Sequence, residues 1–445
     1  MAHKHDDEGS GRSHATAQSA EAATAGSAPG ERACVKLAPA KRSRGWAVVF
    51  CGLGLNLALG VLYAWSVFAK QMTEPVSAGG LGLTKTEASL PYMLAIGVFA
   101  LMMVPAGRMQ DKLGPRKVAM AGAVLTGLGL LVSSLVQPGS LWPVLLGFGL
   151  MAGAGFGLGY AAATPAAIKW FPPEKKGLVT GLVVSGFGLA PVYIAPVARH
   201  LLEDYGVSGA FRILGAVFTL VALALGSRIV NPPAAQAPAM ATPAMALAAP
   251  APDWRAMLRT RAFYLLYIEY TFAALAGLMI IGHLARIIAV QTGGAVQTGF
   301  VFVASMAVFN ALGRLLAGML SDKLGRLRTL LCVCLSQAAV MLAFPGLDGM
   351  AGFFAGSAVV GFSYGACLAL FPATVADYWG AKNFGLNYGI LFTAWGLGGV
   401  FGPLLAGRIA DATGSYTLAY YIAAGLMLAA AALTTITRKP ELTKG

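Results

Sequence analysis

Apolar residues in this chain form long, nearly unbroken runs, separated by short segments that carry Gly, Pro and charge. Each run is roughly 20 residues long, which is what one helix needs to cross a bilayer core of about 30 Å. The alternation of apolar and polar residues that is typical of β-barrel strands is not apparent. From Trp46 onward the pattern predicts twelve membrane-spanning helices, over residues 46–69, 88–108, 118–136, 141–168, 176–198, 209–229, 262–285, 297–319, 329–346, 350–376, 384–406 and 417–436.

The sequence predicts an all-α membrane protein in which these twelve helices form two six-helix bundles. A Pro/Ala-rich stretch without hydrophobic periodicity separates the sixth span from the seventh. The segments we expect are a disordered cytoplasmic tail at 1–45, an N-terminal bundle at 46–230, a cytoplasmic linker at 231–260, a C-terminal bundle at 261–438 and a short tail at 439–445.

Composition supports a membrane class, because 57% of the residues are hydrophobic and only 11% are charged, where soluble proteins have about 25%. The net charge of +14 is explained by basic residues gathered in alternate loops and both termini. That distribution places both termini in the cytoplasm, and it argues against nucleic acid as a partner. We expect a multi-pass protein of a bacterial cytoplasmic membrane, with the lipid bilayer as its surroundings.

Catalytic chemistry has no signature in the sequence. The five cysteines show neither a disulfide framework nor zinc-ligand spacing. We find no nucleophile with a base, no metal-ligand cluster and no phosphate-binding glycine loop. The sequence therefore predicts a protein that is not an enzyme and needs no cofactor or metal.

A loop motif occurs once in each half of the chain. "GRMQDKLGPRK" after the second span recurs as "GMLSDKLGRLR" after the eighth. In each copy Gly permits a tight turn and the Asp can lie near a helix end. A membrane protein built from two related halves commonly binds its substrate at the midplane between them. We interpret the motif as a conformational element whose residues are Gly107, Asp111, Gly114, Arg116, Gly318, Asp322, Gly325 and Arg326.

At these residues the chain resembles the major facilitator superfamily, whose members carry this loop in both halves. "ALAGLMIIGHLA", "NALGRLLAGMLSDKLGR" and "NYGILFTAWGLGGVFGP" more narrowly resemble the oxalate/formate antiporter family, which includes bacterial lactate carriers. The resemblance implies twelve helices, alternating access, action as a monomer and a small carboxylate held by an arginine on the eighth helix.

Arg314 is the arginine of that helix. It lies eight residues before Asp322, so it is ~12 Å from the helix end and close to the middle of the membrane. An arginine there costs about 2.5–3.5 kcal/mol and must face a cavity or a partner. Its fork of donors suits bidentate binding of a carboxylate, whereas the structural alternative is an ion pair with another helix, for instance with Glu269. Asn310, one turn earlier, could bind the same carboxylate, orient the guanidinium or join helices.

Further candidates for the substrate site are Tyr160, Tyr364, Trp395 and Asn56, each of which could instead serve helix packing. The two phenols fall near mid-depth of the fourth and tenth spans and supply a donor with apolar area. Oxalate exchangers of the family that the chain resembles carry a lysine where Trp395 stands. With Trp there, Arg314 is the evident central cation, and this favours a monoanion such as lactate or pyruvate.

Proton coupling would make uptake of a monoanion electroneutral, and the titratable candidates are Glu269 and His283. Either could simply hydrogen-bond between helices. We expect a secondary carrier of small monocarboxylates, working as a proton symporter by alternating access. The alternatives are an oxalate/formate-type anion exchanger and, in another class, a carboxylate sensor built on a carrier fold.

Overall fold

The computed structural model describes residues 39–233, 254–293, 299–380 and 382–440. All the predicted spans lie within one compact unit, Ser43–Gly445. Residues 1–38 of the predicted tail and 234–253 of the predicted linker lie outside the described residues.

Within the described residues, eleven helical segments are long and apolar enough to cross a membrane. One of them contains α7 (Lys176–Gly226), in which Gly206 has a left-handed φ of 66° and separates two consecutive helices. Gly tolerates this conformation, which would strain other residues. The segments thus match the twelve predicted spans and confirm the all-α class of membrane protein.

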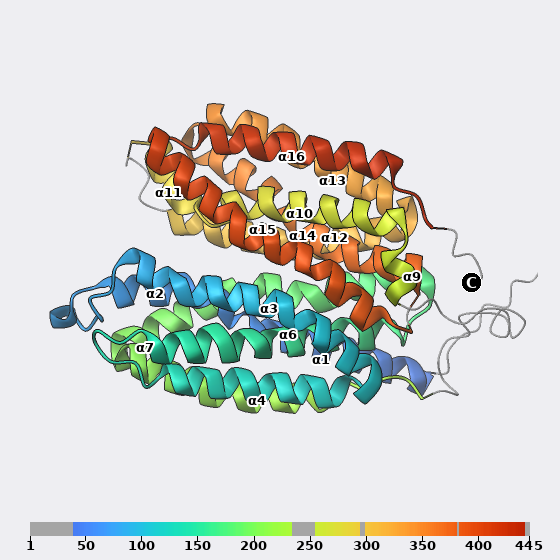
Figure 1. The fold of residues 1–445 in the computed structure, drawn as a ribbon, viewed down its shortest axis with the longest axis horizontal. Coiled ribbons are helices and arrows are strands. Elements are labelled where there is room, and N and C mark those ends of the chain that lie inside the picture. Colours follow the sequence, from blue (N-terminus) through green and yellow to red (C-terminus); the bar gives the residue numbers. More distant parts are fainter. Residues whose placement is uncertain (1–38, 234–253, 294–298, 381, 441–445) are drawn as a thin grey trace, which may run out of the picture. The chain divides into compact units, whose positions relative to one another are not determined.

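The helices of the N-terminal group lie together, as do those of the C-terminal group (Figure 1). The N-terminal group comprises α1 (Pro39–Leu59), η1 (Gly60–Ala64), α2 (Trp65–Thr73), α3 (Lys85–Leu113), α4 (Pro115–Ser133), η3 (Leu145–Ala152), α6 (Gly153–Ile168) and α7. The C-terminal group comprises α10 (Arg261–Ile281), α11 (Leu284–Gln291), α12 (Gly299–Leu324), α13 (Arg326–Ala343), α14 (Gly349–Trp379), α15 (Phe384–Thr413) and α16 (Thr417–Ile436).

Several helices extend beyond the predicted apolar spans. The segment 199–205, which we predicted to be a loop, continues α7 as far as Gly206. Two side-chain pairs four residues apart, Arg199 with Glu203 at 2.7 Å and His200 with Asp204 at 3.3 Å, lie on this extension. Such pairs support a helix that has left the apolar layer, and a hydrophobicity pattern does not register them.

The two groups meet along two seams, α3 against α15 and α7 against α12. Both seams depend on glycine at the end of the molecule that carries the duplicated motif, which we call the motif end. A Cβ on Gly107 would overlap the backbone of Gly385, and a Cβ on Gly318 would overlap that of Gly177. The absent side chains allow the backbones to touch, as is common where membrane helices pack closely.

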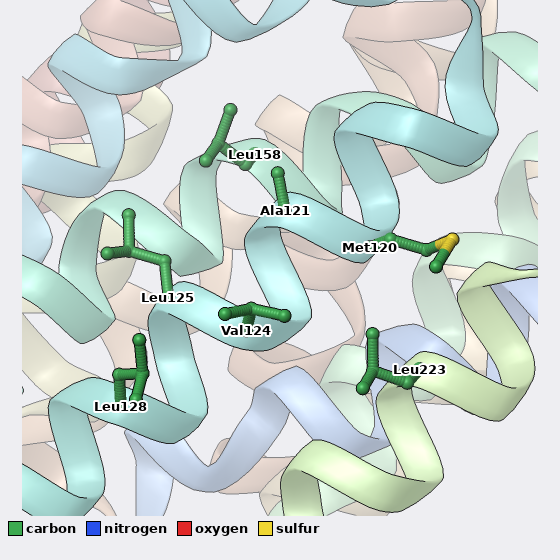
Figure 2. A pocket seen from close by; sticks show the side chains of 7 residues that line it. All are labelled: Met120, Ala121, Val124, Leu125, Leu128, Leu158 and Leu223. Carbon is green, nitrogen blue, oxygen red and sulfur yellow. The ribbon is translucent and has the colours of Figure 1, made fainter.

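Many large apolar side chains face outward, as expected for a surface in contact with lipid. An open groove of about 460 Å³ lies on this outer surface, and its lining is entirely apolar (Figure 2). It offers no group that could bind an anion. The residues that line it are Met120, Ala121, Val124, Leu125, Leu128, Leu158 and Leu223.

Candidate substrate-binding site

Arg314 lies on α12 at the seam with α7, and its side chain is 1% exposed. Its Nε donates to Oδ1 of Asn310 at 2.8 Å, one helical turn earlier. Its Nη1 donates to the main-chain carbonyl of Val184 on α7 at 2.5 Å. Its Nη2 is buried and has no hydrogen-bond partner among the described residues. The guanidinium therefore bridges the two groups of helices and still has donor hydrogens without an acceptor.

Glycine makes this arrangement possible on the α7 side of the seam. A Cβ on Gly188 would lie 3.0 Å from Oδ1 of Asn310 and 3.1 Å from Nε of Arg314. Both distances are shorter than ordinary van der Waals contact. The backbone of α7 can thus pass directly beside the Asn310–Arg314 pair only where it lacks a side chain.

Asn56 lies on α1 and supports the same turn of α7. Its Nδ2 donates to the carbonyl of Val183 at 2.8 Å, next to the carbonyl that Arg314 binds. The side chain is fully buried, and its Oδ1 has no partner among the described residues. Asn56 thus contacts the helix that Arg314 contacts, and no bond joins the two side chains directly.

Tyr364 on α14 and Trp395 on α15 form a buried pair. The indole Nε1 of Trp395 donates to the hydroxyl of Tyr364 at 2.7 Å, and both side chains are 4% exposed. The Tyr364 ring lies against α10, where a Cβ on Gly277 would be 2.6 Å from a ring carbon. The phenol of Tyr63, on η1, interacts with both Tyr364 and Arg314.

An aromatic cluster continues from this pair into the N-terminal group. Trp395 stacks on Phe392 with a centroid distance of 4.8 Å and lies 5.5 Å from Phe99 of α3. Tyr160 of α6 lies 5.6 Å from Phe99 and 5.5 Å from Phe392. Phe187 of α7 packs edge-on against Tyr160 at 5.6 Å and against Tyr63 at 5.2 Å. Rings from both groups thus form one cluster, and Phe187 of this cluster directly precedes Gly188, which lies beside Arg314.

Glu269 lies elsewhere in the C-terminal group. It is 1% exposed on α10, and its Oε1 accepts a hydrogen bond from the hydroxyl of Thr437 at 2.6 Å. Its Oε2 is buried without a partner among the described residues. No ion pair between Glu269 and Arg314 occurs in the part of the chain that the structure describes.

His283 follows the end of α10, at the opposite end of the molecule from the motif. Its Nε2 lies 2.9 Å from the carbonyl of Pro403 on α15, so this nitrogen must be the donor. Its Nδ1 lies 3.4 Å from the hydroxyl of Tyr416. The imidazole therefore connects three segments of the C-terminal group, and none of its hydrogen bonds reaches Arg314.

The two copies of the loop motif are placed alike. Gly114 and Gly325, which end the loops, have φ of 86° and 93°, as expected for tight turns. Asp322 of α12 accepts the backbone N–H groups of Gly177 and Leu178 at the start of α7, both at 2.9 Å. Asp111 of α3 likewise accepts those of Gly385 and Leu386 at the start of α15, at 3.3 and 3.0 Å. Each Asp thus caps a helix of the other group, where the helix dipole favours negative charge.

Only the second copy joins an ion-pair network in the described structure. Arg326 pairs with Asp322 at 2.7 Å and with Asp377 at 2.8 Å. Asp377 also pairs across the seam with Lys176 at 3.1 Å. In the first copy Pro115 stands where Arg326 does, and Arg116 is exposed.

Lys169, between α6 and α7, is the charged residue near Asp111. Burial lowers the pKa of the Lys169 amine, although the nearby Asp111 acts in the opposite direction. The surroundings of the two motif copies therefore differ in charge as well as in geometry.

The structure thus brings together Arg314, Asn310, Tyr364 and Trp395, with Tyr160 joined through the ring cluster. Sequence reasoning did not find Tyr63, Phe99, Phe187, Phe392 or Lys176. Tyr63 could have been noticed, because it follows Asn56 by two helical turns in the same apolar run. The others look like ordinary apolar or terminal residues. No group of three or more His, Cys, Asp or Glu side chains that could hold a metal occurs in the described part of the chain.

Two related six-helix halves with a site between them are an architecture that many secondary transporters share. A model of the Major Facilitator Superfamily matches residues 45–289 and 270–445, and the chain belongs to that superfamily. The superfamily that the loop motif indicated is therefore confirmed.

Relatives agree with this assignment. The oxalate:formate antiporter of Oxalobacter formigenes is 28% identical over 400 residues, which cover 88% of this chain and 91% of that protein. Monocarboxylate transporter 13 of Bos taurus is 26% identical, covering 86% of this chain and 87% of that protein. The structure of the proton:xylose symporter XylE superposes with a TM-score of 0.71 at 12% identity, covering 91% of this chain and 98% of that chain. The fold and the relatives are those of transporters.

Proposed function

We propose that this protein is a secondary carrier of small monocarboxylates, which it moves together with a proton by alternating access. The observation that carries the proposal is the Nη2 of Arg314, a buried charged donor without an acceptor among the described residues, bordered by aromatic rings. A carboxylate is the natural acceptor for a guanidinium fork, and the rings suit a short apolar tail. Two relatives, the oxalate:formate antiporter of Oxalobacter formigenes and monocarboxylate transporter 13 of Bos taurus, are named for small carboxylates as well.

Charge balance favours a monoanion over a dianion. Among the described residues, the buried charged side chains are Lys176, Glu269 and Arg314. Lys176 pairs with Asp377 at the motif end, so Arg314 is the cation available to a ligand in the interior. A second carboxylate would be buried beside Trp395 rather than beside a lysine, and an unpaired buried charge is costly.

A proton is the proposed partner because it cancels the charge that would otherwise move. Carrying one negative charge inward costs ~2.3 kcal/mol per 100 mV of membrane potential. Glu269 is our candidate carrier of the proton, since one of its buried oxygens has no partner among the described residues.

With the motif end in the cytoplasm, as the basic loops favour, the seams close the carrier on the cytoplasmic side.

Uptake by purified protein in liposomes tests the proposal. Labelled lactate and pyruvate should enter faster when an inward proton gradient is imposed, without anion inside. Arg314→Lys should lose most uptake, because a point charge cannot replace the fork. Arg199→Lys is the matched control, since Arg199 is exposed and distant from the site. Uptake by Arg314→Lys at the wild-type rate would disprove the role of the arginine.

Exchange of one monoanion for another is the second candidate, and the similarity to an oxalate:formate antiporter favours it. It also needs no dedicated proton carrier. Uptake that requires formate or lactate inside the liposome and ignores the proton gradient would identify an exchanger. Uptake of oxalate would argue against the selection of monoanions.

A further inference from the structure

We infer that His283 is an acid-sensitive pin between two helices, which holds the short helix α11 on α15 and releases it when the imidazole is protonated. The pin lies at the end of the molecule opposite the motif end, which we call the distal end. Once released, α11 and the adjoining part of α15 are free to move, as a change of access at this end requires. This switch goes beyond the proposed function, because it involves neither the transported anion nor Glu269.

The first span of each half is broken near the distal end. In the N-terminal half η1 separates α1 from α2, which is nine residues long. In the C-terminal half Gly282 and His283 separate α10 from α11, which is eight residues long. Both short helices lie at the distal end (Figure 1). The ends of helices are places where hinges absorb changes in backbone angles.

A ring donor pins each break to the carbonyl of a neighbouring helix. Trp65, the first residue of α2, donates from Nε1 to the carbonyl of Ala88 on α3 at 2.9 Å. His283, the residue before α11, donates from Nε2 to the carbonyl of Pro403 on α15, also at 2.9 Å. The indole cannot change its charge, whereas an imidazole titrates near neutral pH. The two pins are therefore alike in place and length but differ in their response to acid.

The acceptor of the second pin is itself a weak point in α15. Pro403 has no N–H, so the helix lacks one bond of its ladder at this residue. The backbone of Gly282 lies directly on the proline, because a Cβ on Gly282 would be 3.3 Å from two carbons of the Pro403 ring. The imidazole also lies beside Gly407, one turn further along α15. His283 thus ties the break between two helices to the proline of a third.

The surroundings of the ring suit a neutral imidazole. The charged and titratable groups around it are Arg286 of α11, Asp411 of α15 and Tyr416 at the start of α16. Asp411 is already paired with Arg286 at 3.4 Å. The hydroxyl of Tyr416 lies 3.4 Å from Nδ1, to which it donates while the imidazole is neutral. A proton on Nδ1 would take the place of that donated hydrogen.

Acid should weaken the pin for reasons of linkage. His283 lies outside the membrane-spanning segment, which ends at Ile281. Burial lowers the pKa of its imidazole, and the positive charge of Arg286 acts in the same direction. The bond to Pro403 and the charge of Asp411 only partly offset this effect on the pKa.

An imidazole released into water has an ordinary pKa of about 6.5. Since the released ring binds a proton more readily than the pinned ring, the pin is at full strength above about pH 6.5 and weakens as the pH falls below it. At about pH 5.5, one unit below that pKa, the released state gains at most about tenfold over the pinned state.

Hydrogen–deuterium exchange of the backbone amides in α11 measures release of the pin. The full chain is labelled at about pH 7.5 and at about pH 5.5, on either side of the ordinary pKa of about 6.5, with labelling times scaled for the intrinsic effect of pH on exchange. The helix α2 in the same sample is the internal control, because the indole of Trp65 does not titrate. Exchange in α11 should become severalfold faster relative to α2 at the lower pH, with about tenfold as the upper bound.

Three substitutions separate titration from packing. His283→Gln keeps an N–H donor that cannot titrate, so α11 should exchange slowly at both pH values. His283→Ala removes the donor, so α11 should exchange fast at both. The matched control is His200→Gln, since His200 is 75% exposed and pairs with Asp204 within α7. This variant should respond to acid as the wild type does.

The outcomes differ clearly. Exchange in α11 that does not respond to acid, or that accelerates equally in α2, would overturn the inference, and so would an acid response that persists in His283→Gln. Loss of that response in His283→Gln supports the pin whether or not the glutamine holds α11. If His283→Ala does not fold, the wild type and His283→Gln decide without it. The measurement involves no transport, so a failure of the proposed function would leave its result unaffected.

Discussion

The two motif copies should contribute unequally to closure of the motif end, and replacing each Asp by Asn tests this. Asp322 binds two backbone N–H groups of α7 at 2.9 Å and Arg326 at 2.7 Å. Asp111 binds two N–H groups of α15 at 3.3 and 3.0 Å, and no ion pair of 4.0 Å or less involves it among the described residues. Asn keeps the size of each side chain but removes the charge.

The expected magnitudes follow from these contacts. A capping interaction is worth about 0.5–2 kcal/mol, and a hydrogen bond to a charged group about 1.5–3 kcal/mol. Asp111→Asn should therefore lower the free energy that stabilises the closed motif end by about 1 kcal/mol. Asp322→Asn also weakens a pair whose members are 8% and 9% exposed, and should cost about 2–3 kcal/mol. Since these bonds join the two groups of helices, that free energy shifts the equilibrium between closed and open motif ends. The ratio of closed to open motif ends should fall about fivefold in Asp111→Asn and about 30- to 150-fold in Asp322→Asn.

Distances between spin labels across the α7–α12 seam report this equilibrium. Glu174 and Lys323 are exposed on opposite sides of the seam and can carry the labels in a variant without native cysteines. Asp322→Asn should add a clear population at longer distance, and Asp111→Asn a smaller one. Equal shifts in the two variants, or no shift in Asp322→Asn, would refute the reasoning from the ion-pair network.

Two further changes address coupling and the seam beside the site. Glu269→Gln should abolish the stimulation of uptake by a proton gradient but keep the exchange of labelled for unlabelled substrate. The control is Glu203→Gln, because Glu203 is exposed. Stimulation that persists in Glu269→Gln would show that Glu269 is not the proton carrier. Gly188→Ala should lower the affinity for substrate severalfold, because the new Cβ would lie 3.1 Å from Nε of Arg314. The control is Gly425→Ala, which should leave the affinity unchanged because nothing lies within 4 Å of a Cβ at Gly425. Unchanged affinity in Gly188→Ala would show that the seam has room to adjust.

Features that depend on local sequence could be predicted. The apolar runs predicted the spans, and the loop glycines Gly114 and Gly325 do adopt the turns that their spacing indicated. Asn310 and Arg314 share a helix face one turn apart, and their hydrogen bond follows from that spacing. The family followed from the duplicated motif, which is a local pattern as well.

Contacts between distant segments could not be predicted in the same way. Nothing in the sequence says that Asp322 caps α7 or that Trp395 donates to Tyr364, because each pair is far apart in the chain and joined only by packing. The aromatic cluster was missed for a related reason. Phe99 and Phe392 are apolar residues within apolar spans, and hydrophobicity does not distinguish those that line a site from those that face lipid.

The bond from Arg314 to Val184 gives the binding step a means of acting on the seam. The guanidinium is tied to α7 through Nη1 in this structure, so a carboxylate that binds Nη1 and Nη2 together as a fork acts on that bond between the two groups of helices. A ligand can shift a conformational equilibrium only by interacting differently with the two states. Arg314 supplies such a difference, because it contacts the opposite group through a carbonyl oxygen that a carboxylate oxygen can replace. Substrate and seam would then share one guanidinium, and the affinity for substrate should rise when the seam is weakened, as in Asp322→Asn.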